Sequence, residues 1–412
     1  MKRQAAAKSN YLSGCLLMPS RIPTWNYRLP AALLLMAPFD ILTSLAMDIY
    51  LPVVPIMPRA LDTSPAVVQL TLSLYMLILG AGQIVFGPLS DIAGRRPVLL
   101  GGAALFAATS FLMAGTSSAD LFMALRLLQA VGASAALVAT FATVRDVYAE
   151  RPEGAVIYSL LGSMLSFVPA VGPIAGALIA NHFGWRAIFL ALGILTLAAI
   201  FNATLRWDET RPVTVSRPKT AFRPILKDPS FWTYTIGFSA AMGAFFVFFS
   251  TAPRVLIDQA GFSSLAFSLA FATAALVMIA TARFAGRFVK RWGTAGSLAR
   301  GMLMLLVGAT LLAGGELFLT PSFVSFVLPM WIIAIGIVFT TAVTANGALR
   351  AFGDTAGTAV ALYFCVESLI VGLIGTLFVV ILGGDTAWPL AGYCAVMALV
   401  TLFSLWRLQK RT

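Results

Sequence analysis

Charged residues are scarce in this chain of 412 residues: Asp, Glu, Lys and Arg together make up only 11% of it, about half of the usual share. Hydrophobic residues account for 59%. So few charges are not enough for the surface of a water-soluble protein of this length, which excludes the soluble globular classes. We therefore expect an integral membrane protein whose surroundings are the lipid bilayer.

Histidine and cysteine are nearly absent as well, with one His and three Cys in the whole chain. Cys15, Cys365 and Cys394 are widely separated, so their spacing indicates neither a disulfide framework nor a metal site. A zinc site would lack nitrogen ligands because His182 is alone. The chain has no G-x-x-x-x-G-K-[ST] motif, which argues against direct use of ATP. We expect no enzyme activity, no cofactor and no metal.

What the chain has instead is a series of apolar segments of roughly 20 residues or more, each long enough to cross a bilayer as a helix. Backbone groups in lipid must form their hydrogen bonds within the segment, so these segments should be α-helical. We predict an all-α polytopic membrane protein with twelve transmembrane helices in two six-helix bundles. The predicted helices span about 30–52, 66–88, 98–116, 119–143, 155–180, 185–205, 231–253, 264–284, 297–316, 322–346, 355–382 and 386–407.

A polar stretch with four prolines, RWDETRPVTVSRPKTAFRPILKDPS, separates the first six predicted helices from the last six. The charged clusters SDIAGRRP and RFAGRFVKRWG follow the second and the eighth predicted helix, so they echo each other in the two halves. Such internal repeats are typical of secondary transporters. The expected parts are a tail at 1–29, a bundle at 30–205, a linker at 206–230, a bundle at 231–407 and a tail at 408–412.

The net charge of +12 reflects an uneven distribution of Lys and Arg among the loops. If the N-terminus is cytoplasmic, 24 of these residues fall on the cytoplasmic side, and only Arg59, Arg186 and Arg254 fall in outer loops. This bias predicts that both termini are cytoplasmic, and it gives the basicity a topological meaning, so we expect no nucleic-acid partner. The first 29 residues lack a signal-peptide pattern and are interpreted as a cytoplasmic tail.

Four motifs resemble those of one transporter family. GPLSDIAGRRP at 87–97 resembles the loop after the second helix of the major facilitator superfamily, and ALRLLQAVGAS at 124–134 resembles the helix-four Arg motif of its proton-coupled members. FVPAVGPIAGALI at 167–179 resembles the helix-five motif of its drug antiporters. MDIYLPVVP at 47–55 resembles the bicyclomycin and chloramphenicol resistance subfamily. The similarity extends from about residue 25 to the C-terminus.

The resemblance implies a monomeric drug:proton antiporter of the bacterial cytoplasmic (inner) membrane, and phenicol exporters are the members that the chain resembles most. The implied partners are protons and a neutral aromatic drug such as chloramphenicol or florfenicol. A broad multidrug or metabolite exporter of the same superfamily remains the alternative. The chain departs from the family pattern at Ile92, where a basic residue is usual, and at Ala177, where a second glycine is usual.

Two acids and one arginine fall inside predicted membrane helices, where an ionised group costs about 2.5–3.5 kcal/mol on insertion scales. Asp40 lies near the middle of the first helix, Asp48 lies about 12 Å further along it, and the two bracket the expected depth of Arg126. An acid that alternates between a proton and this arginine could couple proton entry to drug exit. A fixed buried ion pair is the alternative, and Asp48 could equally cap or gate the helix.

Other side chains inside the predicted helices could line the drug pathway. Phe245 and Phe249 belong to a run of four phenylalanines, of which only one or two can face one cavity because each residue turns the helix by about 100°. Glu367 is a third intramembrane acid, which could line the cavity or stay buried as the neutral acid. The substrate-binding candidates are Asp40, Ser44, Tyr75, Gln83, Phe245, Phe249, Asn346 and Glu367.

The first motif indicates a conformational latch between the two halves. Glycines permit tight turns, and an aspartate can accept hydrogen bonds from an arginine or from a helix N-terminus. The alternative is a solvated loop whose arginines only fix the topology. The expected latch residues are Gly87, Asp91, Gly94, Arg95 and Arg96.

The helix-five motif indicates a bendable seam. Pro169 and Pro173 each remove a backbone donor and bend the helix, while Gly172 and Gly176 let another helix approach closely. Ordinary helix packing is the alternative, and it is compatible with a seam.

Overall fold

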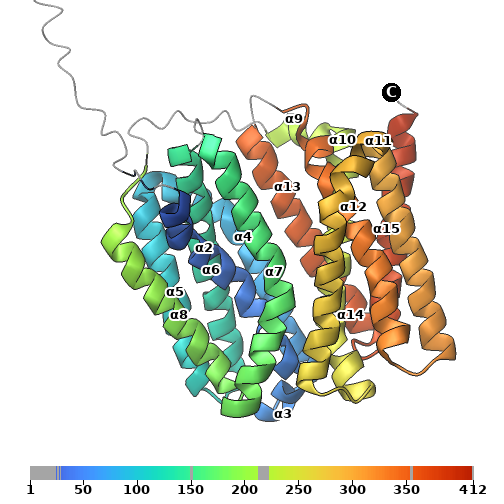
Figure 1. The fold of residues 1–412 in the computed structure, drawn as a ribbon, viewed down its shortest axis with the longest axis horizontal. Coiled ribbons are helices and arrows are strands. Elements are labelled where there is room, and N and C mark those ends of the chain that lie inside the picture. Colours follow the sequence, from blue (N-terminus) through green and yellow to red (C-terminus); the bar gives the residue numbers. More distant parts are fainter. Residues whose placement is uncertain are drawn as a thin grey trace, which may run out of the picture.

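The computed structural model describes residues 25, 27, 29–148, 152–211, 222–352 and 356–410. Within these residues every regular element is a helix, and the helices form two bundles that stand side by side (Figure 1). The first bundle contains the chain up to residue 211, and the second contains the chain from residue 222.

The first bundle consists of seven helices and one short 3-10 turn. They are α2 (Leu29–Asp48), the turn η1 (Leu51–Ile56), α3 (Met57–Ala60), α4 (Pro65–Ala93), α5 (Arg95–Gly115), α6 (Ala119–Tyr148), α7 (Pro152–Phe183) and α8 (Arg186–Arg206). The first predicted helix was expected to continue to residue 52, but the α-helix ends at Asp48. Pro52 and Pro55 lack an N–H group for the helical ladder, and the chain continues as the 3-10 turn η1.

The second bundle alternates long helices with short π-helical turns. Its elements are α9 (Phe222–Lys227), α10 (Pro229–Pro253), η2 (Arg254–Gln259), α11 (Ser264–Phe318), η3 (Phe323–Val327), α12 (Leu328–Leu349), α13 (Ala356–Ile370), η5 (Val371–Gly375), α14 (Thr376–Leu382) and α15 (Trp388–Gln409). Asp228 begins α10 by accepting a hydrogen bond from the backbone N–H of Phe231 at 2.8 Å.

Ten helices among the described residues are long and apolar enough to cross a membrane. One of them, α11, has 55 residues and is interrupted at Gly293, whose φ of 68° is a backbone conformation that glycine adopts without strain. The interruption lies between the eighth and ninth predicted helices. In addition, α7 contains the shorter apolar segment Phe167–Phe183. The count of twelve crossings stays a prediction.

A pair of facing glycines joins two helices in each bundle. A Cβ atom added at Gly102 of α5 would lie 2.7 Å from the carbonyl oxygen of Gly132 in α6, and one added at Gly132 would lie 2.5 Å from that of Gly102. Gly301 of α11 and Gly336 of α12 face each other in the same way, at 2.8 and 2.7 Å. Backbones approach so closely only where side chains are missing. The two pairs indicate an internal structural repeat.

The bundles meet along two pairs of helices. α7 packs on α11, where the Ser268 hydroxyl donates to the carbonyl oxygen of Pro173 at 2.9 Å. α4 packs on α13 and η5, and the hydroxyls of Ser73 and Thr376 are joined by a hydrogen bond of 2.6 Å. In addition, η1 contacts α10, α11 and η2 of the second bundle. These contacts close the molecule at the end that contains η1 and α3, which we call the η1 end.

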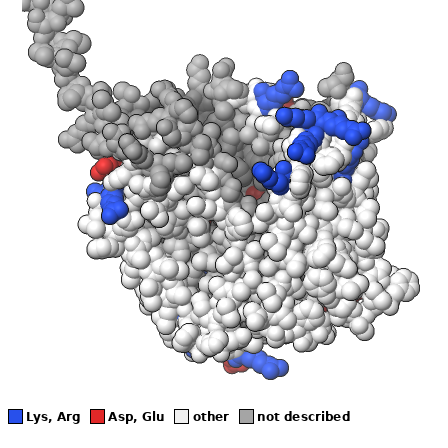
Figure 2. Space-filling model, in the orientation of Figure 1, with Lys and Arg blue, Asp and Glu red and all other residues white. Residues whose placement is uncertain are grey.

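Lys and Arg side chains gather at the opposite end, where α15 finishes, and we call it the basic end (Figure 2). Between the two ends the same view shows a broad white band, in which no Lys, Arg, Asp or Glu of the described residues is visible. This asymmetry is the charge distribution from which the sequence predicts cytoplasmic termini, and the orientation in the membrane stays a prediction.

Candidate binding cavity and buried charges

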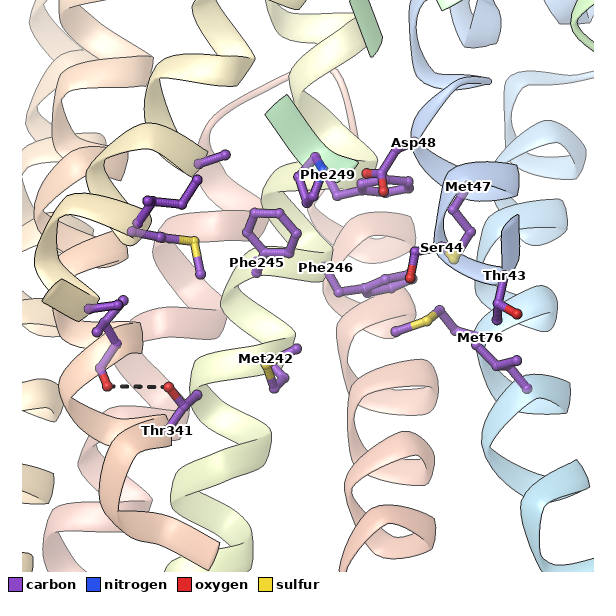
Figure 3. Close-up of a pocket in the computed structure, with 17 residues that line it drawn as sticks. Thr43, Ser44, Met47, Asp48, Met76, Met242, Phe245, Phe246, Phe249 and Thr341 are labelled. Carbon is purple, nitrogen blue, oxygen red and sulfur yellow. Dashed lines mark hydrogen bonds between the residues drawn. The ribbon is translucent and has the colours of Figure 1, made fainter. Parts of the chain in front are cut away.

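A cavity of about 400 Å³ lies between the bundles (Figure 3). Its walls come from α2, α4 and α7 of the first bundle and from α10, α11 and α12 of the second. Its volume falls within the range of small-molecule sites, about 300–1,000 Å³. The lining residues are Thr43, Ser44, Met47, Asp48, Met76, Leu79, Pro169, Met242, Phe245, Phe246, Phe249, Ala275, Met278, Ile279, Ala282, Val338 and Thr341.

The two bundles contribute different chemistry to this cavity. The polar side chains of the first bundle are Thr43, Ser44 and Asp48, all from α2. The second bundle contributes an aromatic wall from α10, and Figure 3 shows Phe245, Phe246 and Phe249 opposite Ser44 and Asp48. We call these two surfaces the polar face and the aromatic wall. A ligand with one polar and one aromatic part matches this arrangement.

Four methionines add an adaptable surface: Met47 and Met76 from the first bundle, and Met242 and Met278 from the second. The unbranched thioether side chain reshapes itself around irregular ligands and makes favourable contacts with aromatic rings. Sequence reasoning missed these residues. A usable signal is the spacing of Met47 three residues after Ser44, which puts both on one side of the helix.

Asp48 is the acid that lines the cavity, and it is only 5% exposed. No salt bridge joins it to a cation in the described part of the chain. α7 packs directly against it, since a Cβ atom added at Gly172 would lie 2.7 Å from its Cβ. One added at Gly176 would overlap the carbonyl oxygen of Ile49. The two glycines of the helix-five motif therefore bring α7 onto the end of α2.

Asp40 is 1% exposed, and neither of its carboxylate oxygens has a hydrogen-bond partner in the described part of the chain. It lies one helical turn from Ser44 on the same side of α2 but does not line the cavity. This acid is thus inside the protein and not in lipid. A buried carboxyl without a cation or donor is far more stable neutral than ionised.

Arg126 of α6 is fully buried and forms no ion pair with either acid among the described residues. It donates to Oε1 of Gln129 at 2.6 Å and to the carbonyl oxygen of Ala46 in α2 at 2.8 Å. Ala46 lies about 240° around the helix from Asp40 and about 200° from Asp48. The arginine therefore contacts the side of α2 that faces away from both acids, and the expected acid–arginine pair is not formed in this conformation.

The Arg126 guanidinium is the centre of a cluster that joins several helices. Its carbon Cζ lies 4.6 Å from the ring centroid of Tyr75 in α4 and 5.2 Å from that of Tyr50, at distances typical of cation–π contacts. Gln129 links the cluster to α5 by donating to the Ser110 hydroxyl at 2.8 Å. Tyr75 donates to the carbonyl oxygen of Thr43 at 3.0 Å, so it positions α2 and does not line the cavity, contrary to prediction.

The cavity includes three of the eight residues proposed as substrate-binding candidates, Ser44, Phe245 and Phe249. The other five do not line it. Gln83 is half-buried in α4, Asn346 is exposed near the end of α12, and Glu367 is buried in α13. Each was proposed because it is polar within an apolar helix, a criterion that does not determine which side of the helix it occupies.

Arg95 forms the centre of the loop motif at the basic end. It makes ion pairs with Asp91 at 2.5 Å and with Asp146 of α6 at 2.7 Å, and it donates to the Ser90 hydroxyl at 2.7 Å. Arg145 adds a longer contact to Asp91 at 3.8 Å. A network of this kind neutralises the buried guanidinium and holds α4, α5 and α6 together.

Glu209, just after α8, caps the N-terminus of α5. Its carboxylate accepts hydrogen bonds from the backbone N–H groups of Arg95 and Arg96 at 2.8 and 3.2 Å. A Cβ atom at Gly94, whose φ is 107°, would lie 2.5 Å from this carboxylate, so the turn requires glycine. Sequence reasoning missed both Glu209 and Asp146, because each comes from a different segment of the chain.

Two expectations for the latch need correction. Among the residues that the structure describes, all the partners of this cluster belong to the first bundle, and none of them forms a latch to the second bundle in this conformation. Gly87 makes no tight turn, since it lies within the continuous helix α4 and a Cβ added there would meet no atom within 4 Å. α4 continues past Gly87 to Ala93, although the next residue, Pro88, has no backbone N–H to donate.

Comparisons with known proteins agree with this architecture. Residues 40–376 match the family described as Major Facilitator Superfamily. A chloramphenicol resistance protein of Pseudomonas aeruginosa is 50% identical over 387 residues, which cover 93% of this chain and 92% of that protein. A bicyclomycin resistance protein homolog of Haemophilus influenzae is 28% identical over 89% of this chain and 94% of its own length.

Solved structures show the same fold at low sequence identity. A bacterial homolog of the human lysosomal transporter Spinster, in an inward-facing and occupied conformation, superposes with a TM-score of 0.71 at 16% identity and covers 94% of this chain and 97% of its own. With a family match over most of its length and this shared fold, the chain belongs to the major facilitator superfamily of membrane transporters.

Proposed function

We propose that this protein exports phenicol antibiotics such as chloramphenicol and florfenicol from the bacterial cytoplasm in exchange for protons. The observation that most supports this proposal is the cavity between the bundles, with a polar face on α2 and an aromatic wall on α10. The 50% identity to a chloramphenicol resistance protein supports the same class of drug. The proposal includes twelve membrane crossings, cytoplasmic termini and a monomeric protein.

The chemistry of a phenicol fits the two surfaces. Its aryl ring can stack against Phe245 and Phe249, where each aromatic contact is worth about 0.5–1.5 kcal/mol. Its hydroxyl and amide groups can exchange hydrogen bonds with Ser44 and with the carboxyl of Asp48. The ligand carries no net charge, and the lining residues include no Lys or Arg that would require an anionic partner.

The acids of α2 supply the proposed proton coupling. Asp40 and Asp48 are both buried without a cation partner in the described residues, so each is held as the neutral acid in this conformation. Access of water in another conformation would let the proton leave. Arg126 acts on this step indirectly, by fixing the position of α2 through Ala46 and Tyr50.

The decisive experiment measures chloramphenicol uptake into inverted membrane vesicles under an imposed pH gradient, since the cytoplasmic face of the protein points outward there. We expect Asp40→Asn to lower gradient-driven transport sharply while drug exchange at equal pH continues, because the variant retains the cavity but cannot bind a proton at this position. Asp120→Asn, a change at an exposed acid in the first turn of α6, is the matched control. Gradient-driven uptake by Asp40→Asn at the wild-type rate, at equal membrane abundance, would reject the role of this acid.

A broader multidrug exporter is the second candidate. It is favoured by the four methionines of the cavity, since thioether-rich surfaces accommodate varied ligands. Asp48 could also hold a cationic drug if it were ionised. Minimum inhibitory concentrations for phenicols and for lipophilic cations, with and without expression of the protein, separate the two. Protection against phenicols alone supports the first proposal, and protection against both classes supports the second.

A further inference from the structure

The contact between α4 and α13–η5 is a regular seam between the two bundles. Its contacts pair Gly80 with Ser368, Leu77 with Gly372 and Ser73 with Thr376. A Cβ added at Gly80 would overlap the Ser368 side chain, so the helices are closest at this pair. Ile84, the next residue on this face of α4, is 44% exposed. The seam therefore ends at Gly80 on the side of the basic end.

Glu367 lies directly beside this last contact of the seam. Its side chain is 7% exposed, and its Oε2 accepts a hydrogen bond of 3.2 Å from the hydroxyl of Ser368. No salt bridge joins it to a cation in the residues that the structure describes. The π-helical turn η5 begins four residues later, and such turns in membrane helices are frequent at functional sites.

The described residues around Glu367 give it no charged partner. Tyr363 of α13 donates to the Thr344 hydroxyl at 3.0 Å, and Tyr393 of α15 donates to the carbonyl oxygen of Ser239 at 2.8 Å, with Cys394 beside it. The other titratable residues on elements packed against α13 are Tyr75 and Asp91 of α4, Tyr234 of α10, and Arg223 and Lys227 of α9. Of these, Tyr75 contacts Arg126, Asp91 pairs with Arg95, and the two α9 cations are exposed at the surface.

We infer that Glu367 is a second proton-binding site, carried by the second bundle at its seam with α4 and separate from the acids of α2. The inference rests on the proposed proton-driven export. It assigns two protons to each exported drug molecule, one to the α2 acids and one to Glu367.

The position of Glu367 at the end of the seam explains how proton binding follows the conformational change. With the seam closed, the carboxyl has a hydroxyl donor but no cation, and an ionised group would be costly there. When the bundles rock and α4 separates from α13, the contacts from Gly80 to Thr376 open and Glu367 becomes accessible from the η1 end. The carboxylate then binds a proton from that side, and the seam closes over the neutral acid. The same O–H bond breaks, and the proton passes to water, when drug that enters from the basic end admits water to the carboxyl.

The test measures the limiting chloramphenicol gradient that proteoliposomes reach at an imposed pH difference of one unit and no membrane potential. Each coupled proton multiplies this gradient by about ten, because one pH unit corresponds to about 1.4 kcal/mol. We expect about 100-fold accumulation with wild type and about tenfold with Glu367→Gln. Glu367→Asp, which keeps an acid, should restore most of the wild-type value.

Glu316→Gln is the matched control. This acid accepts a hydrogen bond from the backbone N–H of Ala387 at 3.0 Å and lies outside the seam, so its loss should leave the limiting gradient unchanged. Drug exchange at equal pH shows that each variant is folded and active. A wild type that responds to the pH gradient and a Glu367→Gln variant with the same limiting gradient would overturn the role of Glu367 alone. A wild type that ignores the pH gradient would overturn the proposed proton coupling, and this inference with it.

A measurement on the unmodified protein keeps the inference testable if the glutamine variant does not fold. Chloramphenicol added to purified wild type in weakly buffered solution with a pH indicator should displace two protons per bound drug, and Asp40→Asn should displace one. Displacement of a single proton by wild type would contradict the second site.

Discussion

Facing glycines bring neighbouring helices into backbone contact in both bundles, as Gly102 with Gly132 and Gly301 with Gly336. The buried charges do not follow this repeat. The first bundle buries Asp40, Asp48, Arg95 and Arg126, which lie on three of its helices, whereas the charged residue buried in the described second bundle is Glu367. Packing is therefore common to the two bundles, while their charge differs.

The aromatic residues show the opposite bias. Behind the aromatic wall, the ring of Phe248 stacks on Phe271 at 5.0 Å with an interplanar angle of 9° and on Phe326 at 5.6 Å. The rings nearest to the charges of the first bundle, Tyr50 and Tyr75, instead face a guanidinium. The second bundle thus presents a rigid apolar surface, and the first presents the groups that can exchange protons and hydrogen bonds.

The largest effect that this contrast predicts is at Arg126. Arg126→Lys should lower the rate of drug efflux by about 100-fold, because an ammonium group cannot replace two directed hydrogen bonds worth about 1.5–3 kcal/mol each together with the ring contacts. Efflux rates in vesicles, normalised to membrane abundance, measure this. Arg186→Lys is the control, since Arg186 at the start of α8 donates to the exposed Ser117 hydroxyl and lies outside the cluster of Arg126. Wild-type rates with Arg126→Lys would mean that the directed hydrogen bonds and ring contacts of the guanidinium are dispensable.

An intermediate effect is expected at the glycine pairs. Gly132→Ala and Gly336→Ala should each lower the free energy of unfolding by about 1–3 kcal/mol, because a methyl group would be forced against backbone atoms. Thermal unfolding of the purified variants measures the loss. Gly101→Ala should leave stability nearly unchanged, since a Cβ there meets no atom within 4 Å. If one variant lost much more unfolding free energy than the other, the two glycine pairs would not pack in the same way.

The smallest effect concerns the aromatic wall. Phe249→Ala should weaken chloramphenicol binding by about two- to twelvefold, which corresponds to one aromatic contact of about 0.5–1.5 kcal/mol. Equilibrium binding to purified protein gives this ratio. Phe201→Ala removes a ring that is 68% exposed on α8 and should not change affinity. An unchanged affinity in Phe249→Ala would place the ligand against the polar face only.

Much of the fold could be predicted from apolar segment lengths. The long helices lie where the sequence predicts them, since each segment must satisfy its own backbone in lipid. The ends were less predictable. α2 stops at Asp48 because prolines follow, and the predicted helix 355–382 is divided by the π-helical turn η5. Such breaks depend on a few residues against a uniformly apolar background.

The candidate site was less predictable, because side-chain direction decides it. Ser44 and Phe249 reach the cavity, but Tyr75 contacts Arg126, and Glu367 is bound by Ser368 beside the seam with α4. Arg126 contacts α2 at Ala46, at the depth that the residue count predicts. Ala46 is nevertheless rotated by about 200° around the helix from Asp48, so the arginine meets the side without the acid. Depth follows from counting residues, whereas rotation depends on how neighbouring helices pack.

The division of the cavity between the bundles has a consequence for how a bound molecule is released. The polar groups that would bind it belong to α2, and the aromatic rings that would contact its flat part belong to α10. When the bundles pivot, the two sets of contacts separate. The affinity for the bound molecule therefore falls because of the motion alone. Release on the other side of the membrane then requires neither a chemical change in the bound molecule nor a competing ligand.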